Sequence, residues 1–252
     1  LILPALLDGY DPGLKKPDHL LSSEYMTLEG RKISTSQNWA IWVQDLLDQV
    51  PADSIRYFLL SNNPEKRDAD FSWPSFISSH NGELLGALGN LVNRTLQFIK
   101  KYRDGVTLNE PCDPAIWTEI AACYRECGAL LEQGEIKASL ERAFKLVRQL
   151  NKYFDQTKPW LTRDDDPGSC DRALATCLHG LANLSQLLAP FLPFTCLKIR
   201  QDLQLPEKTG WEPVICPCGR ILGDISILFP RLEAGKFGGD ALLCDNKAAA
   251  VK

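Results

Sequence analysis

The sequence predicts a mainly α-helical protein, in which a bundle of helices follows a short segment of mixed α/β character. Three observations support this fold class. Apolar residues recur at the 3.6-residue spacing of a helix through most of residues 73–201. Short links that contain Pro or Gly join these periodic stretches, as in antiparallel helical bundles. The first sixty residues instead mix short apolar runs with turn-forming pairs.

Residues 1–72 are predicted to contain both a short strand and a short helix. Residues 25–28 have the composition of a strand, and Glu29-Gly30 supplies the turn that would end it. A polar loop rich in hydroxyl groups follows at residues 31–38. Pro51, placed near a first helical turn, predicts a helix from about residue 50 to about residue 60.

Residues 73–232 are predicted to form the helical bundle. Apolar periodicity predicts five helices in it, over residues 76–102, 113–131, 135–156, 171–188 and 191–201. The third must end before Pro159, because proline disfavours the helical conformation in the residue ahead of it. Residues 211–230 are predicted to be a short extended segment. Residues 233–252 are rich in Gly and Ala without periodicity, and are predicted to be a flexible tail.

The composition of the 252 residues excludes several classes of protein. The chain is 44% hydrophobic, which is enough for one large or two modest domains. No stretch approaches the roughly 20 apolar residues of a membrane span, and no signal peptide is evident, so a cytoplasmic protein is expected. The first residue is not Met, which suggests a start inside a longer protein. The net charge of −4 excludes a uniformly basic surface for nucleic acid.

Nine cysteines are scattered along the chain without a regular framework. In a chain of this size without a secretion signal, reduced thiols are more common than disulfides. Cys216-Pro217-Cys218 resembles half of a zinc knuckle, but zinc sites usually pair two such units and the sequence has no second one. No metal site is therefore predicted.

The polar loop carries the first resemblance to a known family. Residues 32–36, Lys-Ile-Ser-Thr-Ser, resemble the KMSKS signature of class I aminoacyl-tRNA synthetases. A mobile loop with a cation and small hydroxyl groups can close on the triphosphate of ATP and stabilise charge on the pyrophosphate. The order of the flanking segments, residues 24–30, 37–43, 53–60 and 68–73, is similar to that of methionyl-tRNA synthetases. The resemblance extends over about residues 1–233.

This resemblance implies a role for the loop residues. Lys32, Ser34 and Ser36 would take part in catalysis, and Lys32, Ile33, Ser34 and Thr35 would bind ATP. Thr35 stands where the family usually has a second lysine, which removes one positive charge from the phosphate-facing loop.

The histidine-bearing signature that accompanies this loop in class I enzymes is not present around His19, His80 or His179. The fragment alone is therefore expected to be inactive, as the end of a catalytic core at residues 1–72 followed by an anticodon-binding domain at residues 73–232. His19 and His80 are expected at the surface, and His179 on a helix near the surface of the bundle.

A polar stripe on the first long helix is the second candidate site. Asn90, Arg94, Gln97 and Lys101 fall within about 60° of one another on a helical wheel. Such a stripe offers an amide for base edges and cations for phosphate or stacking, although a plain solvated face has the same pattern.

The family resemblance gives this stripe a role. Residues 89–94 resemble the family's Asn-Leu-x-x-Arg element, and residues 151–160 resemble its Asn-x-Tyr-x5-Pro-Trp element. Asn90, Arg94, Pro159 and Trp160 would then contact a CAU anticodon, with the indole of Trp160 stacking on a base. The alternative for Trp160 is a core residue at a helix end.

The resemblance implies a methionine–tRNA ligase as the full-length parent, with ATP and Mg, methionine and tRNA(Met) as its cofactors and partners. Two alternatives remain open. A synthetase-like paralogue that binds tRNA without catalysis is supported by Thr35. A helical protein-interaction module is supported by the net negative charge.

Overall fold

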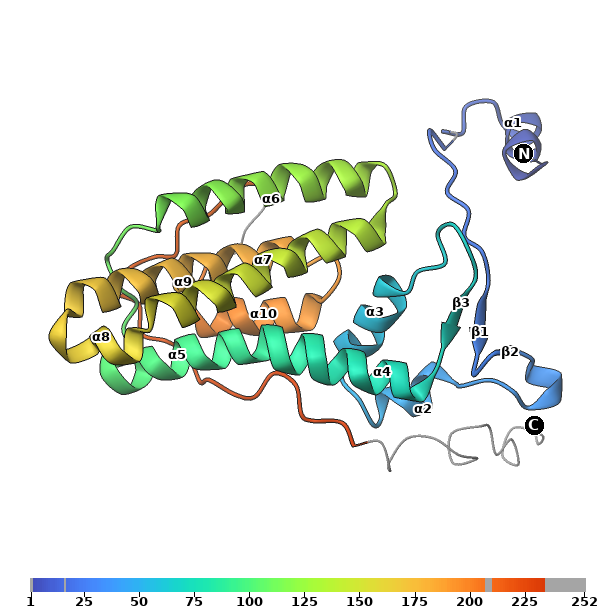
Figure 1. The fold of residues 1–252 in the computed structure, drawn as a ribbon. Coiled ribbons are helices and arrows are strands. Elements are labelled where there is room, and N and C mark those ends of the chain that lie inside the picture. The colour runs from blue at the N-terminus through green and yellow to red at the C-terminus, as the bar shows by residue number, and fades with distance from the viewer. Residues whose placement is uncertain (1, 16, 207–209, 234–252) are drawn as a thin grey trace.

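The computed structural model describes residues 2–15, 17–206 and 210–233, and it confirms a mainly helical chain with one small sheet (Figure 1). The helical bundle forms one end of the molecule, and the sheet with its hairpin forms the other. Helix α1 (Ile2–Tyr10) stands apart from both at the end of an extended segment. Among the described residues, no helix is both long and apolar enough to cross a bilayer.

The small sheet has three short strands in the order β2-β1-β3. Strand β1 (Met26–Leu28) pairs antiparallel with β2 (Arg31–Lys32) and parallel with β3 (Ala69–Phe71). The strand predicted at residues 25–28 is therefore present. Glu29 and Gly30 form the turn with φ angles of 49° and 71°, a left-handed conformation that glycine adopts without strain.

An aromatic cluster packs the sheet against α3 (Ala52–Ser61) and the helix that carries Phe76. Phe58 of α3 contacts the rings of Phe71 and Phe76 edge-on, with centroids 5.1 and 5.5 Å away. Aromatic pairs prefer this edge-to-face geometry. The helix predicted at about residues 50–60 is thus confirmed as α3. The connecting segment also contains η1 (Thr35–Gln37) and α2 (Val43–Leu47).

Helix α3 also ties the sheet end of the molecule to the bundle. The Nε and Nη2 atoms of Arg56 donate to the carbonyl oxygens of Phe191 and Pro190 at 2.8 and 2.9 Å. The buried carboxylate of Asp53 accepts a hydrogen bond of 2.6 Å from the backbone N–H of Thr195. Charge-assisted bonds of this kind are stronger than neutral ones, so the two ends are firmly joined through α3.

The helix predicted at residues 76–102 is continuous but not uniform. It consists of α4 (Trp73–Ser79), a π-helical segment η2 (His80–Gly89) and α5 (Asn90–Tyr102). A Cβ atom added at Gly86 would lie 3.0 Å from the carbonyl oxygen of Asn81, and one at Gly89 would lie 3.1 Å from that of Leu84. Glycine therefore permits the close backbone approach of the wide π turn, which apolar periodicity alone does not reveal.

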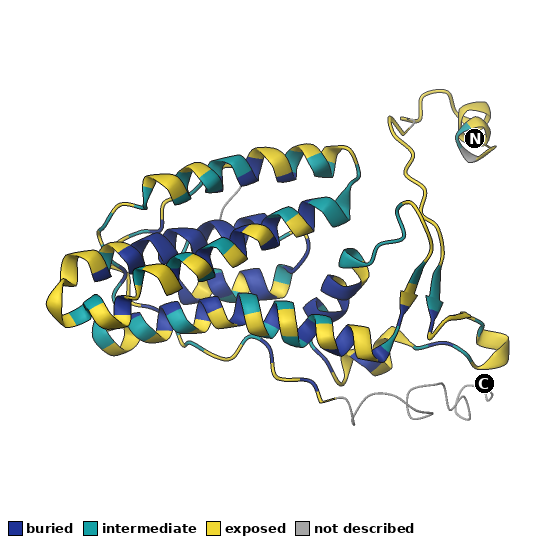
Figure 2. Cartoon of the chain, viewed as in Figure 1, coloured by how far each residue is buried: buried dark blue, intermediate teal, exposed yellow. Residues whose placement is uncertain are grey.

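The remaining helices complete the bundle around α5. They are α6 (Pro114–Glu132), α7 (Ile136–Thr157), α8 (Pro159–Asp165), α9 (Pro167–Leu187) and α10 (Pro193–Asp202). Proline occupies the first position of four of them, where its missing N–H would be unpaired in any case. Helix α9 lies at the centre and is buried on every side from Ala173 to Leu187, whereas α5, α6 and α7 each present one exposed face (Figure 2). The sequence predicted all of these helices except α8.

Two of the histidine predictions are wrong. His80 is only 1% exposed, and its Nε2 donates to the carbonyl oxygen of Pro230 at 2.8 Å while its Nδ1 accepts from the hydroxyl of Ser54 at 2.9 Å. His179 is also buried, and both of its ring nitrogens are paired with backbone atoms. Its Nε2 donates to Glu110 O, and its Nδ1 accepts from Cys216 N. Burial lowers the pKa of both imidazoles. Partners so far away in sequence are not visible in a local pattern.

The last described segment runs across the bundle as an irregular strap of residues 210–233. It pairs with the chain at Thr107, whose hydroxyl donates to Pro217 O at 2.7 Å and accepts from Arg220 N at 2.8 Å. Near its end, the side chain of Asn81 makes two hydrogen bonds with the backbone of Leu232. The predicted extended segment is therefore present without regular strands. The predicted tail lies outside the described residues except for Glu233, and the domain boundary near residue 72 stays a prediction.

Candidate functional site

The hydroxyl-rich loop closes on itself at the far end of the sheet. The backbone N–H and carbonyl of Ser34 pair with those of Trp39 at 2.8 Å in both directions. The indole N–H of Trp39 donates to Leu28 O at 2.9 Å and fixes the base of the loop to strand β1. Asn38 has a φ of 54°, so it makes the tight left-handed turn inside the loop. The loop is thus shaped by backbone bonds at its base.

The side chains of this loop that were predicted to bind ATP are mostly exposed. Lys32, Ile33, Thr35 and Ser36 are exposed, and Ser34 is half-buried. The hydroxyl oxygens of Ser34 and Ser36 lie 3.2 Å apart. No carboxylate occurs in residues 31–38, so the loop offers a cation and paired hydroxyl groups without a competing anion. This donor set suits a phosphate-bearing ligand.

Arg31 does not extend the charge of the loop outward. Its guanidinium carbon lies 4.1 Å from the centroid of the Trp39 ring, in a cation–π contact at the base of the loop. Lys32 therefore supplies the cation that projects from residues 32–36. Thr35, three residues after Lys32, adds a hydroxyl group and no charge.

At the opposite end of the molecule, three side chains from three helices form a layered cluster. The guanidinium carbon of Arg94 on α5 lies 4.3 Å from the ring centroid of Phe154 on α7, and 5.9 Å from that of Trp160 on α8. The Phe154 and Trp160 rings stack with centroids 5.9 Å apart and planes at 29°. Arg94 Nη2 forms an ion pair with Asp155 Oδ1 at 2.6 Å, which fixes the orientation of the guanidinium. We call Arg94, Phe154 and Trp160 the indole cluster.

The backbone between α7 and α8 sets the position of Trp160. Lys158 adopts the left-handed conformation with φ 46° and ψ 56°, and this turn ends α7 and begins α8. Pro159 is buried at the first position of α8, and the thiol of Cys170 lies 3.4 Å from its carbonyl oxygen. Trp160 follows directly and remains 43% exposed. The turn therefore displays the indole at the surface, and the core-residue alternative for Trp160 is wrong.

The other polar residues predicted for this surface lie on α5, the helix that carries Arg94. Asn90 is exposed and precedes Arg94 by one helical turn, so the two side chains are neighbours on one face of α5. Gln97 and Lys101 are exposed farther along α5. Asn90 also lines a cavity of about 370 Å³ between η2, α5 and residues 226–229 of the strap. Predicted residues Asn90, Arg94, Pro159 and Trp160 thus lie at one edge of the bundle.

Local charge on these helices differs from that of the whole chain. Helix α5 has three basic residues and no acidic one, a net charge of +3. Helix α7 has five basic and two acidic residues, also +3, whereas α6 has one basic and three acidic residues, −2. The net charge of −4 therefore coexists with two basic helices, α5 and α7, among the three that carry the indole cluster, whereas α8 has one basic and two acidic residues.

Sequence reasoning missed Phe154 as part of this cluster. It lies on the apolar stripe of α7, which indicated a core position, and it is in fact buried. Its ring contacts the Arg94 guanidinium and stacks with the Trp160 indole. Phe154, in the last turn of α7 before the left-handed residue Lys158, thus supports Arg94 on α5 and Trp160 on α8.

A second cavity contains several candidate metal-binding residue types. It has a volume of about 640 Å³ and lies between residues 108–112, α9 and the strap, lined in part by Cys112, Trp117, His179, Cys216 and Cys218. Both nitrogens of His179 are used in hydrogen bonds to backbone, and burial raises the pKa of Cys216 to about 12. In the part of the chain that the structure describes, no group of three or more His, Cys, Asp or Glu side chains is arranged to hold a metal ion. The eight cysteines described are free thiols.

Two family models match this sequence. The model of class I tRNA synthetases (M) matches residues 1–96, and the model of the anticodon-binding domain of tRNA ligase matches residues 113–218. The chain is 48% identical over 234 residues to methionine–tRNA ligase 1 of Alkaliphilus oremlandii, and 47% identical over 233 residues to a methionine–tRNA ligase of Bacillus anthracis. These alignments cover 92% of this chain and 43% and 42% of the relatives, so the chain spans less than half of their length.

Solved structures agree with this similarity at the level of the fold. The Mycobacterium tuberculosis methionyl-tRNA synthetase in complex with methionyl-adenylate superposes with a TM-score of 0.82 at 23% identity, over 91% of this chain and 47% of that one. The apo form of the same enzyme gives a TM-score of 0.80 at 21% identity, over 92% and 47%.

Proposed function

Since the chain belongs to the methionyl-tRNA synthetase family, we propose that it provides the anticodon-recognition surface and part of the ATP site of a methionine–tRNA ligase. The observation that carries this proposal is the indole cluster, with Asn90 one helical turn away on α5. An exposed indole backed by a buried phenyl ring is a ready stacking surface for an unpaired base. The adjacent amide and guanidinium can hydrogen-bond base edges.

In this proposal, Asn90, Arg94, Pro159 and Trp160 recognise the anticodon of tRNA(Met). Trp160 stacks on one base, Arg94 contributes a planar cation, and Asn90 reads base identity through its amide. Pro159 holds the left-handed turn that displays the indole. Because the stacking residues are packed before any RNA arrives, little ordering would be needed on binding, which favours affinity.

The same proposal gives the hydroxyl-rich loop a role in ATP binding. Lys32, Ile33, Ser34 and Thr35 would contact ATP, and Lys32, Ser34 and Ser36 would stabilise the charge on the departing pyrophosphate. The exposed ammonium group and the hydroxyl pair 3.2 Å apart support this assignment. Mg²⁺ would be bound mainly through the ATP phosphates, as is usual for this ion. Methionine would be the second substrate of the whole enzyme, and the cytoplasm its compartment.

The 252-residue chain can test tRNA recognition directly. Titration with an anticodon stem-loop that contains CAU should give saturable binding, and changing one anticodon base should weaken it by about tenfold or more. Equal binding of all loops would mean contact with the backbone alone. No binding to any stem-loop would overturn the proposal and favour a helical protein-interaction module.

Thr35 supports a second candidate, a tRNA-binding paralogue without catalysis. The loop then holds one projecting cation at Lys32 and binds the triphosphate weakly. Aminoacylation of tRNA(Met) by the full-length protein separates the two. Activity supports the ligase, whereas CAU-selective binding without activity supports the paralogue.

A further inference from the structure

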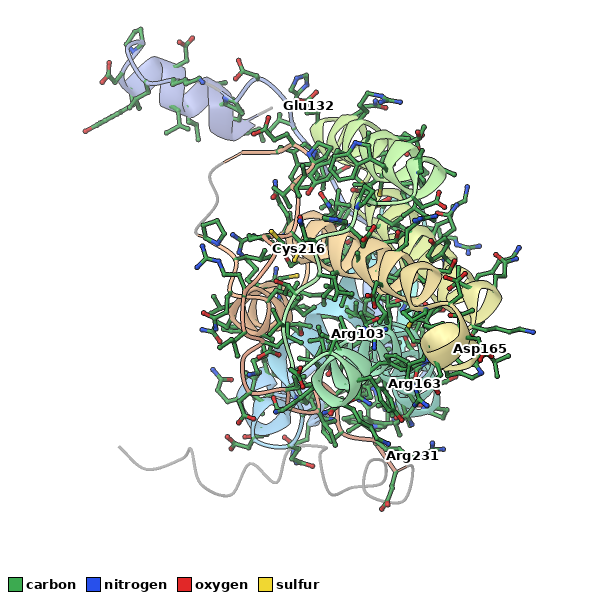
Figure 3. All side chains as sticks on the ribbon, turned by 90° about the vertical axis from the view of Figure 1, so that its left-hand side faces the viewer. Arg103, Glu132, Arg163, Asp165, Cys216 and Arg231 are labelled. Carbon is green, nitrogen blue, oxygen red and sulfur yellow. The ribbon has the colours of Figure 1, made fainter. Side chains whose placement is uncertain are left out.

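A second cation–aromatic pair lies farther along the same edge of the bundle. The guanidinium carbon of Arg163 on α8 lies 4.4 Å from the ring centroid of Tyr102, the last residue of α5. The Phe98 ring packs against Tyr102 with centroids 4.7 Å apart. Figure 3 looks onto this end of the molecule, where Arg163 and Arg103 come from different elements. Tyr102 and Arg163 are both partly exposed.

This pair repeats the arrangement of the indole cluster two helical turns away. On α5, Arg94, Phe98 and Tyr102 are spaced at i, i+4 and i+8, so they form one row on the helix. On α8, Trp160 and Arg163 are three residues apart and also share a face. In the first pair α5 supplies the cation and α8 the ring, whereas in the second α5 supplies the ring and α8 the cation.

The spacing separates the two pairs by more than one nucleotide. Eight residues of α-helix span about 12 Å. Stacked nucleotides rise by about 3.4 Å each. Arg94 and Tyr102 are therefore separated along α5 by about three stacked nucleotides, and the two pairs are distinct positions along one row.

The charges around Tyr102 favour a nucleotide over an acidic peptide. Arg163 already has an acidic partner in Asp164, to which its Nε donates at 2.8 Å, and Arg103 pairs with Asp171 at 2.5 Å. What these arginines still offer is a planar surface, which suits a base. Lys101 is exposed, and its ammonium nitrogen lies 5.0 Å from the Tyr102 ring centroid, which places a cation where a phosphate would accompany that base.

We propose that Tyr102 and Arg163 form a second stacking position, which holds a further unpaired nucleotide of the tRNA anticodon loop beside those at Trp160. This inference rests on the proposed anticodon recognition. The contacts of this position are a ring face and a guanidinium plane, and the Asp164 carboxylate is already paired with Arg163, so the position stabilises a nucleotide of any identity. It adds affinity and sets the path of the loop, while base selectivity belongs to Asn90, Arg94 and Trp160.

Three single variants of the 252-residue chain test this inference, with the CAU stem-loop as the probe. Tyr102→Leu keeps apolar bulk against Phe98 but removes the ring, and should weaken binding by about fivefold to a hundredfold. Tyr102→Phe keeps the ring and should bind within about twofold of the unchanged chain. Arg163→Lys keeps the charge but loses the plane, and should weaken binding about as Tyr102→Leu does.

Base selectivity distinguishes this position from the indole cluster. In Tyr102→Leu, the ratio of affinities for the CAU loop and a loop with one altered anticodon base should equal the ratio in the unchanged chain. In Trp160→Ala, that ratio should fall toward one. Thermal melts of each variant identify any loss of binding that arises from unfolding, and Arg163→Lys, which alters a surface side chain, keeps the test valid if Tyr102→Leu is unstable.

The failure of this inference can be told apart from the failure of the proposed function. If Tyr102→Leu and Arg163→Lys bind the stem-loop as the unchanged chain does, while Trp160→Ala is weakened, the second position is refuted and anticodon recognition stands. If Tyr102→Leu is weakened while Arg163→Lys retains full binding, the Arg163 contact is a charge contact and its stacking role is refuted. If the unchanged chain binds no stem-loop, both proposals fall.

Discussion

The two candidate sites of this molecule are held in place by different means. The hydroxyl-rich loop is fixed at its base by the backbone pairing of Ser34 with Trp39, and its side chains project from the surface. The indole cluster is fixed by side chains that stack on one another, over the buried ring of Phe154. The loop therefore has a defined path but little packing, whereas the cluster rests on a core residue, Phe154.

This difference matches what each site would have to do. A loop that closes on a nucleotide needs a conformation that can change at low cost, and segments with few buried contacts open most easily. A surface that recognises three bases gains affinity when its side chains are ordered beforehand. The structure thus joins a poorly packed site and a well-packed site through the hydrogen bonds of α3 and through the continuous helix of α4, η2 and α5.

The largest expected effect comes from removing the cation of the loop. In the full-length protein, the proposed function predicts that Lys32→Ala lowers the rate of methionyl-adenylate formation by about 10²- to 10³-fold, because one donor to the developing charge is lost. Pyrophosphate exchange measures this rate. Binding of the CAU stem-loop by the same variant should be unchanged. A parallel loss of stem-loop binding would break the separation of the two sites.

The next effect concerns the indole. Trp160→Ala should weaken binding of the CAU stem-loop by about 1–3 kcal/mol, because a stacking surface is removed. Its melting temperature should change by a few degrees at most, since the side chain is 43% exposed.

Trp42 provides a matched control for this variant. It is also 43% exposed, but it lies in the sheet end of the molecule. Trp42→Ala should leave stem-loop binding intact. A large drop in the stability of Trp160→Ala would show that the indole supports the core and would weaken the proposed role.

A pH titration compares the two regions by their buried histidines. Burial lowers the pKa of His80, at the junction with α3, and of His179, inside the bundle. The unfolded chain therefore binds protons first as the pH falls below about 6.5, and the free energy of unfolding should decrease by about 1–2 kcal/mol from pH 7.5 to pH 5.5. Urea unfolding at each pH measures this change.

A conservative variant tests whether His179 contributes to that pH dependence. His179→Gln keeps an amide that can bond to Glu110 O and Cys216 N but removes the titration. It should reduce the decrease between pH 7.5 and pH 5.5. An unchanged pH dependence in this variant and in His80→Gln would contradict the assignment to these two residues.

The smallest expected effect is a gain at the loop. In the full-length protein, the proposed function predicts that Thr35→Lys raises the rate of adenylate formation by about two- to fivefold, because it adds an exposed charge worth at most about 1 kcal/mol. Gln37→Lys adds the same charge two residues farther along and should have less effect. A rate that does not respond to Thr35→Lys would mean that the loop already has all the charge it can use.

Much of the fold could be predicted because the helices are amphipathic. The periodic apolar residues of α5 to α7 indicated their positions, and β1 followed from its composition and the Glu29-Gly30 turn. Helix α8 was missed because Pro159 was understood only as the end of α7. Proline is equally suited to the first position of a helix, and here Pro159 both follows the end of α7 and begins α8.

The candidate sites were predicted unevenly for a physical reason. Asn90, Arg94 and Trp160 are polar or exposed residues in short sequence patterns, so a local pattern can identify them. Phe154 supports them from the core, and no local pattern distinguishes it from other apolar residues of α7. His80 was placed wrongly because its partner at Pro230 lies 150 residues away.

The π-helical segment η2 has a consequence for how this family member can change over evolution. A residue in a π-helix turns through a smaller angle than the 100° of an α-helix, so ten such residues rotate everything downstream relative to α4. Inserting or deleting one residue between His80 and Gly89 would leave the chain helical but swing Asn90 and Arg94 around the axis of α5. The number of residues in this stretch therefore sets the direction in which a distant surface faces, and a change in it would require that surface to be rebuilt on different residues.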